Sequence, residues 1–450
     1  MRRVTRFLAL LTFAAAHTAH AQQGGLRSKI AQLFIFGDGQ NPLFLAGTAD
    51  TSNPASIRAH GSHFVPSAVS ENASIIGFLT DAISENVSNI PIGSTSGGET
   101  FRFEGGVPVK TSISSGPVFG ERAQTLGRGR ILAGVSRNSF HFSTLRGQDL
   151  SDLRLFFTHQ NVNDSIAPGC SVAQNADCSK MGVPTLENDV MLFQLDMDIN
   201  VDVTSFYASY GISDGIDFSV VVPLVSTKLH GESNAQIIPF GGTSAAHFFS
   251  GTPTNPDLQA TRTVDGSAFG LGDIATRLKI SIHESAHSGV ALLADARFAT
   301  GSEEDLLGSG KFAARGLAII SATYGAFSPH VNLGYVYRQA TEQNDAVLAT
   351  VGFDHLMAER VTVAADLVSE LQVGRSNLKL PAPVHYDVPF RRTINPTTIP
   401  DMRDDIVNGS LGFKFSTPGG FTIVTNALIP VNRGGLRANS TYTFGIEYSM

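Results

Sequence analysis

The chain has 450 residues, of which 42% are hydrophobic, only 16% are charged and 45 are glycine, and its formal net charge is −7. An acidic balance of this kind argues against nucleic acid as a partner. Because each interior glycine weakens a helix by about 1 kcal/mol, the composition favours a β-protein. Beyond the N-terminal segment, no apolar run approaches the ~18 residues that would indicate a membrane helix.

The first 21 residues have the pattern of a secretory signal peptide. Arg2, Arg3 and Arg6 precede an apolar run at 7–16, and Ala-His-Ala at 19–21 forms a small-x-small cleavage site. We expect residues 1–21 to be removed on export. The alternative is an uncleaved anchor, but the apolar run is short of the roughly 20 residues that span a bilayer.

Residues 22–98 differ from the rest of the chain because they contain scattered prolines and one helix-like stretch at 74–89. Its apolar residues recur at helical spacing: Ile75, Ile76, Leu79, Ile83 and Val87. We interpret 22–98 as a plug or periplasmic segment with a short helix. A plug could present four apolar residues to a hydrophobic cargo: Phe34, Phe36, Phe44 and Leu45. A periplasmic extension is the alternative, given the loop-like composition.

Strict alternation marks residues 193–204. Phe193, Leu195, Met197, Ile199, Val201 and Val203 alternate with Gln194, Asp196, Asp198, Asn200, Asp202 and Thr204. Successive strand side chains point to opposite faces, so one face is apolar and the other polar. Similar patterns occur at 331–337, 411–415 and 442–449. Runs of ten or more match the ~9–11 residues of a tilted membrane strand better than the ~6 of a soluble sandwich.

The fold predicted for residues 99–450 is therefore all-β, a transmembrane antiparallel barrel. Short connections at 213–215, 283–288, 326–329, 355–359 and 417–420, with a turn near 146–151, separate longer segments at 114–129, 161–188, 231–269, 301–311, 338–345, 374–404 and 432–440. Bacterial barrels pair short periplasmic turns with long outer loops. Counting gives about 14 strands, or 12 if residues 101–113 form a local hairpin around Gly105-Gly106 within the plug.

The polar faces of these strands predict a hydrated lumen. We expect the lumen to be lined by charged residues that include Asp196, Asp198, Asp202, Arg277, Lys279 and Arg297. The only two cysteines, Cys170 and Cys178, both lie in the predicted outer loop at 161–188. An oxidising envelope favours a disulfide between them, and the loop has no histidine cluster to suggest a metal site.

Two apparent catalytic motifs occur in the wrong context. His283-Glu284-Ser285-Ala286-His287 matches the zinc-protease pattern, which requires a helix, yet here it joins two alternating strands. The glycines at 270–272 resemble a dinucleotide loop but lead into a strand instead of a helix. We therefore predict no catalytic residues, no metal and no cofactor, and hence no enzymatic activity.

Several stretches resemble one known family. The strand-turn-strand at 210–218 followed by Val-Pro-Leu-Val at 222–225 is similar to the transporter family labelled "MetA-pathway of phenol degradation". Further similar stretches are at 115–123, 140–142, 269–274, 299–301, 307–310 and 332–335, with Ala299 where many members carry proline. The resemblance covers about 101–450. It implies an outer-membrane barrel related in architecture to long-chain fatty acid and aromatic hydrocarbon channels.

From these observations we expect a channel in the bacterial outer membrane for passive or gated uptake of small hydrophobic or aromatic compounds. Its partners would be outer-membrane lipid and the small hydrophobic substrate, with a monomer favoured. The alternative is a structural or adhesive barrel whose long outer loops, 231–269 and 374–404, bind external partners. An outer-membrane hydrolase is the third hypothesis.

Overall fold

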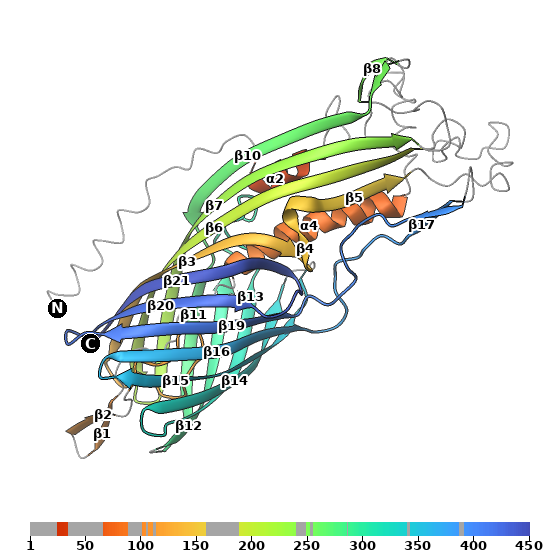
Figure 1. The fold of residues 1–450 in the computed structure, drawn as a ribbon. Coiled ribbons are helices and arrows are strands. Elements are labelled where there is room, and N and C mark those ends of the chain that lie inside the picture. The colour runs from red at the N-terminus through yellow and green to blue at the C-terminus, as the bar shows by residue number, and fades with distance from the viewer. Residues whose placement is uncertain are drawn as a thin grey trace.

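The computed structural model describes residues 25–34, 66–88, 101–104, 107–110, 114–158, 189–239, 249–252, 255–285, 287–339, 343–386 and 391–450. These residues form a closed antiparallel barrel of 12 strands (Figure 1). Pairing of the last strand with β3 closes the barrel. The barrel strands are β3 (Ile131–Leu145), β6 (Asp189–Ser213), β7 (Ile216–Pro239), β11 (Ile274–Glu284), β12 (Ser288–Phe298), β13 (Ala313–Ala322), β14 (Phe327–Arg338), β15 (Ala346–Ala358), β16 (Val361–Gln372), β19 (Ile406–Ser416), β20 (Phe421–Pro430) and β21 (Leu436–Ser449).

The predicted barrel is confirmed with the smaller of the two strand numbers. β1 (Phe101–Glu104) and β2 (Val107–Lys110) pair only with each other, as a separate hairpin. Short connections join successive strands at one barrel end, at 214–215, 285–287, 323–326, 359–360 and 417–420. The connections at the opposite end are longer. This confirms the predicted asymmetry and identifies the short-turn end as the periplasmic end.

One side of the barrel is much taller than the rest. β6 has 25 residues and β7 has 24. β10 (Gln259–Leu271) pairs with the outer half of β7, where the shorter strands have ended, and β5 (Leu153–Thr158) pairs with the outer half of β6. We call β5, β6, β7 and β10 above this point the tall wall; Figure 1 shows it extending beyond the barrel. The expected outer loop 231–269 is therefore largely strand.

Small elements complete the outer end. β4 (Gln148–Asp149) and the short helix η2 (Leu150–Asp152) lead from β3 into β5. β8 (Ser250–Thr252) pairs with β9 (Asn255–Asp257) beyond the tall wall, and β17 (Val384–Tyr386) pairs with β18 (Arg392–Ile394).

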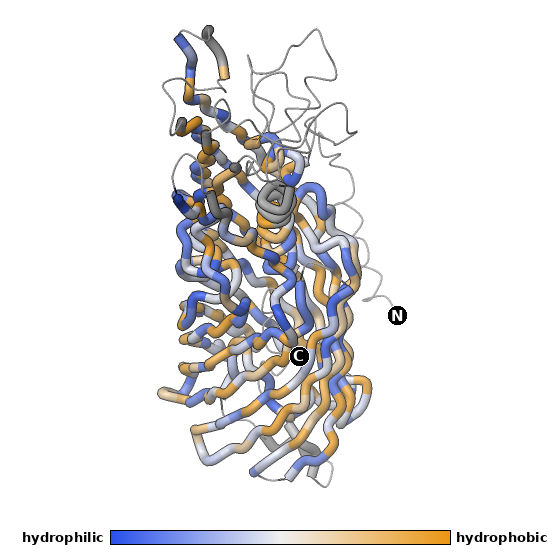
Figure 2. The backbone as a smooth tube through the Cα atoms, turned by 90° about the vertical axis from the view of Figure 1, so that its right-hand side faces the viewer, coloured by the Kyte–Doolittle hydropathy of each residue, from blue (hydrophilic) through white to orange (hydrophobic). Residues whose placement is uncertain are grey.

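The chemistry of both strand faces reverses partway along β6. From Phe206 to Ile212, the outward side chains are apolar and 48–51% exposed at Phe206, Tyr210 and Ile212, whereas the inward Ser205 and Ser209 are buried. Between residue 204 and the outer end of β6 the apolar face is the inward one. The alternate residues from Phe193 to Val203 point inward there and are 0–3% exposed. Lipid favours an apolar outer face and water favours a polar one, so the reversal marks where β6 leaves the membrane. Figure 2 shows the alternation of hydrophilic and hydrophobic residues along the strands.

Two N-terminal helices fill the space inside the tall wall. α2 (Leu26–Gln32) and α4 (Pro66–Ser88) bury their apolar side chains in one core with the inward residues of β5, β6 and β7. All five apolar residues of the predicted helix, from Ile75 to Val87, are at most 9% exposed. The inward apolar face of β6 thus contacts protein, where the sequence pattern suggested lipid. Among the described residues, no helix has the length and hydrophobicity to cross a bilayer.

Candidate functional site

A loop inside the barrel divides the lumen. Residues 114–130, which we call the inner loop, enter from the periplasmic end, reach the middle of the barrel and return to start β3. Along this path Ser115 N donates to Thr362 Oγ1 (3.0 Å), Glu121 N to Asn332 Oδ1 (2.8 Å), and Leu126 N to Asp217 Oδ2 (2.9 Å). The prediction of an outer loop at 114–129 was wrong. The turn at 146–151 correspondingly lies at the outer end.

Buried ionic contacts hold the inner loop in place. Arg122 is 3% exposed; its Nε donates to Asp354 Oδ1 at 2.8 Å, and its Nη2 contacts Asp354 and Ser114. Gly120 N donates to Asp366 Oδ2 at 3.3 Å, beside the His330–Asp366 contact of 2.7 Å. Gly120 is required because an added Cβ would lie 2.1 Å from His330 Nε2. The loop is therefore tightly fitted against the lumen wall.

A cluster of charges lies beside the tip of the inner loop. Lys279 Nζ and Arg277 Nη1 lie 3.3 Å and 3.6 Å from the Glu121 carboxylate. Asp295 in turn accepts hydrogen bonds from Arg277 Nε (2.8 Å) and Arg315 Nη2 (3.0 Å). Arg297 also lies inside, with Nε 3.4 Å from Asp295 Oδ1. Arg277, Lys279 and Arg297 are at most 4% exposed, so the structure places these three predicted residues in the lumen.

The three predicted lumen aspartates lie elsewhere. Asp196, Asp198 and Asp202 project from the outer face of the tall wall, where Asp198 and Asp202 side chains are 52% and 37% exposed. The prediction was wrong because β6 reverses its face chemistry above the membrane. Asp198 is paired in register with His230, and His230 Nδ1 contacts Asp265 at 2.7 Å. This hydrogen bond raises the pKa of the His230 imidazole above its ordinary value.

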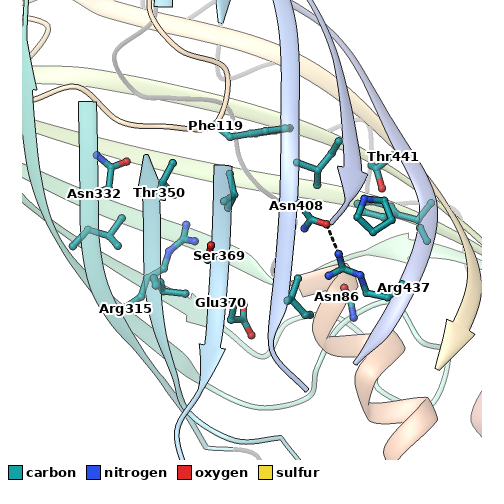
Figure 3. A pocket seen from close by; sticks show the side chains of 18 of the residues that line it. Asn86, Phe119, Arg315, Asn332, Thr350, Ser369, Glu370, Asn408, Arg437 and Thr441 are labelled. Carbon is teal, nitrogen blue, oxygen red and sulfur yellow. Dashed lines mark hydrogen bonds between the residues drawn. The ribbon is translucent and has the colours of Figure 1, made fainter. Parts of the chain in front are cut away.

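A cavity of about 180 Å³ lies between the tip of the inner loop and the last turn of α4. Phe119 and Glu121 of the inner loop line one end of it, and Asn86 of α4 lines the other end; Figure 3 shows Phe119 and Asn86 on opposite sides of the cavity. Its apolar lining comes mainly from the strands: Phe140, Phe142, Leu293, Leu317, Leu348, Val368, Ile406, Leu428, Pro430, Leu436 and Ala438. Its further charged residues are Arg277, Arg315, Glu370 and Arg437. The surface of the site is mostly apolar, although 11 of its 23 lining residues are polar or charged.

A second loop caps the outer mouth through Asp273. Asp273 is 4% exposed, and its carboxylate accepts hydrogen bonds from Gly301 N (2.9 Å) and from Ser309 N (2.7 Å). A register shift at 272–273 lets β10 and β11 run consecutively along β7 and turns Asp273 towards this loop. The glycine-rich stretch at 270–275 leads into a strand, as predicted, but it follows the strand β10 and not the long loop that was expected. Leu306 and Leu307 of the loop insert into the core around the helices.

The remaining predicted residues have other placements. Phe34 packs against Phe193 with ring centroids 5.5 Å apart, outside the lining of the cavity. Phe36, Phe44, Leu45, Cys170 and Cys178 lie outside the described residues. His283, Glu284 and His287 are exposed at the hairpin between β11 and β12, so the protease-like motif has no helix. Within the described part of the chain, no group of three or more His, Cys, Asp or Glu side chains is arranged to hold a metal ion.

Sequence reasoning missed most of the cavity. Of its lining residues, only Arg277 was named as a site residue. Phe119 and Glu121 were assigned to an outer loop, and Arg437 to the outer segment 432–440, although β21 begins at Leu436. The adjacent charges Glu121 and Arg122 within a run of small and apolar residues were the available signal. They indicate a segment that needs buried ionic partners.

Part of the chain matches a known protein family. Residues 189–362 match the family described as "Putative MetA-pathway of phenol degradation", which confirms the resemblance found in the sequence over that segment. No curated protein sequence matches the chain. The match includes the tall strands, the Asp273 junction and several cavity-lining residues.

Solved structures of outer-membrane proteins are similar to this chain at low identity and low TM-score. An outer-membrane channel from Pseudomonas putida F1 is 9% identical, with a TM-score of 0.40, covering 73% of this chain and 98% of that one. A Pseudomonas aeruginosa FadL homologue is 9% identical (TM-score 0.34; 71% and 90% covered). The Pseudomonas putida toluene transporter TodX is 12% identical (TM-score 0.26; 75% and 95% covered).

Features of the barrel itself indicate where in the cell the protein lies. Its backbone groups pair between strands without a free edge in the 12-stranded part, and its outer face carries large exposed apolar residues on every strand from β11 to β21. A closed barrel of this kind can face lipid, and the alternation of short turns with long outer connections is that of bacterial outer-membrane proteins. The protein is an outer-membrane barrel.

Proposed function

We propose that this chain, which matches the MetA-pathway of phenol degradation family over residues 189–362, is a channel for uptake of small hydrophobic or aromatic compounds. The observation that carries the proposal is the cavity. It has a mostly apolar lining, holds about 180 Å³ and lies on the barrel axis between the outer helices and the inner loop. An apolar cavity of about 150 Å³ is large enough to bind benzene.

The route through the protein would have two parts. At the outer end, α2 and α4 act as a plug inside the tall wall and offer apolar surface to an entering molecule. At the periplasmic side of the cavity, the inner loop fills the lumen and is held by Arg122 and Asp354. Passage therefore requires the inner loop to move, so the proposed uptake is gated. The proposal includes no energy source and no cofactor. No catalytic step is part of the proposal.

Uptake by cells lacking the gene, complemented with variants, tests the proposal. Val368 lines the cavity, whereas the adjacent Leu367 is 47% exposed on the lipid face of the same strand. Val368→Trp should reduce uptake of toluene at limiting concentration to the level of cells without the gene, because the indole fills the chamber. Leu367→Trp is the matched control and should transport normally. Equal toluene uptake by all strains, with the protein folded in the outer membrane, would contradict a channel function.

A further inference from the structure

The cavity contains one arginine that no carboxylate of the described residues contacts directly, although the Glu370 carboxylate attracts its charge from a greater distance. Arg437, the second residue of β21, is 5% exposed. Its Nη2 donates to the Val407 carbonyl at 2.8 Å and to Asn408 Oδ1 at 2.7 Å. Both acceptors are neutral, and Nε and Nη1 have no hydrogen-bond partner in the part of the chain that the structure describes. Figure 3 shows this side chain beside Asn86 and Asn408 at the cavity.

A buried cation without a counter-charge is costly, and proteins normally pair such groups. Here the neighbouring carboxylates are already engaged. Glu370 lies 2.5 Å from Arg338 Nη2, and Glu121 lies 3.3 Å from Lys279 Nζ. The cavity wall adds a second incompletely satisfied guanidinium, because Arg315 Nε has no partner among the described residues. The charges left over at the cavity are therefore positive.

The shape of the rest of the cavity limits which anionic ligand could bind beside Arg437. Leu317 on β13, Leu348 on β15 and Val368 on β16 give the cavity an apolar wall. A volume of about 180 Å³ has room for one aromatic ring and a small substituent. Polar groups beside Arg437, from Asn408 and Thr441, could complete the contacts of a carboxylate.

We propose that the cavity binds small aromatic carboxylates, with the ring against Leu348 and Val368 and the carboxylate accepting hydrogen bonds from Arg437. This inference rests on the proposed function and narrows its substrate class. Guanidinium–carboxylate contacts are commonly bidentate and are about twice as strong as neutral hydrogen bonds. The site therefore discriminates between an aromatic acid and a neutral ring of the same size.

Equilibrium binding to the full-length protein in detergent tests the inference with matched probes. Benzoate and benzamide have nearly the same shape and differ in charge, and toluene and acetate represent the ring and the acid alone. Benzoate should bind about 10- to 100-fold more tightly than benzamide, the range of one charge-assisted hydrogen bond. Arg437→Met should remove this preference, and Arg437→Lys should restore part of it. Arg137→Met is the control, because that side chain is 62% exposed on the outer face.

The outcomes separate the inference from the function on which it rests. Equal affinity of the wild-type protein for benzoate and benzamide, with toluene bound, would overturn the inference and leave the channel intact. Absence of binding by any ring compound would count against both. Arg437 also lies beside the last turn of α4, where a cation is favoured. A purely structural role there would make Arg437→Met less heat-stable with an unchanged preference for benzoate, which would also overturn the inference.

Discussion

Asp273 illustrates how one buried carboxylate organises the outer mouth of the barrel. It accepts hydrogen bonds from Gly301 N, Ser309 N and Ser309 Oγ, at 2.7–2.9 Å. Glycine at 308 permits this close approach, since an added Cβ would lie 2.5 Å from Asp273 Oδ1. The two glycine-rich stretches that resemble the family, at 269–274 and 307–310, meet at this carboxylate. This one contact limits the size of the side chains that both stretches can carry there. The loop they hold contributes Leu306 and Leu307 to the core.

Replacing this carboxylate should release the loop. Asp273→Ala leaves the buried N–H groups of Gly301 and Ser309 without an acceptor, at a cost of about 1–3 kcal/mol each. We expect protease added to intact cells to cleave the variant within residues 300–311 much faster than the wild type. Asp305→Ala is the control, because Asp305 lies in the same loop and accepts a side-chain hydrogen bond from Ser302 only. Equal cleavage of the two variants would show that Asp273 does not anchor the loop.

At the scale of elements, the inner loop constricts the lumen in the structure described here. It has no regular secondary structure, and its backbone N–H groups at 115, 120, 121, 123 and 126 donate to side chains of the barrel wall. These acceptors replace the partners that a strand would have supplied, so the loop can be buried without unsatisfied backbone groups. Ionic contacts of Arg122 with Asp354 and of Glu121 with Lys279 add to the fit.

Breaking the Arg122 contact should open the lumen. Arg122→Ala leaves Asp354, which is 0% exposed, as an uncompensated buried charge, a change that typically costs about 3–5 kcal/mol. The inner loop should leave its position, and single-channel conductance in planar bilayers should rise above that of the wild type. Arg128→Ala changes an exposed residue of the same loop and should conduct like the wild type. A closed Arg122→Ala channel of wild-type stability would contradict the constriction.

Regular elements were more predictable from sequence than the lumen loop. Strands such as β21 and helix α4 follow from local periodicity, because each residue's face depends on its position along the element. The inner loop has no period, and its burial depends on acceptors 91 to 247 residues away in the chain. The cavity has the same origin: Phe119, Val368 and Arg437 meet only after closure of the barrel. Alternation in β6 identified its two faces correctly but could not say which one lipid covers.

The whole molecule is divided by the level at which the tall wall leaves the membrane. In the β6–β7 pair, Phe206 and Val222 are outward and apolar, whereas Asp202 and Ser226, four register positions further out, are polar. β10 changes slightly further out, since Phe269 pairs with Ser226 and is 62% exposed, and Ser267 follows it outward. Three adjacent strands therefore change from apolar to polar within a few residues of one another. Above it the protein folds like a water-soluble domain, with an apolar interior formed by α2, α4 and the wall.

This boundary predicts which positions a water-soluble reagent can reach. In a chain with Cys170→Ser and Cys178→Ser, Asp198→Cys should react with a membrane-impermeant maleimide on intact cells, because that position is outside the lipid and exposed. Phe206→Cys should not react, although Phe206 is 48% exposed in the protein alone, because lipid covers it. Both cysteines should react after unfolding in detergent, which controls for their intrinsic reactivity. The two positions are eight residue steps apart, about 26 Å of strand, so the two environments are well separated. Equal labelling of both cysteines on intact cells would mean that the tall strands lie wholly in water. Protection of both would mean that the polar face of β6 lines a lumen.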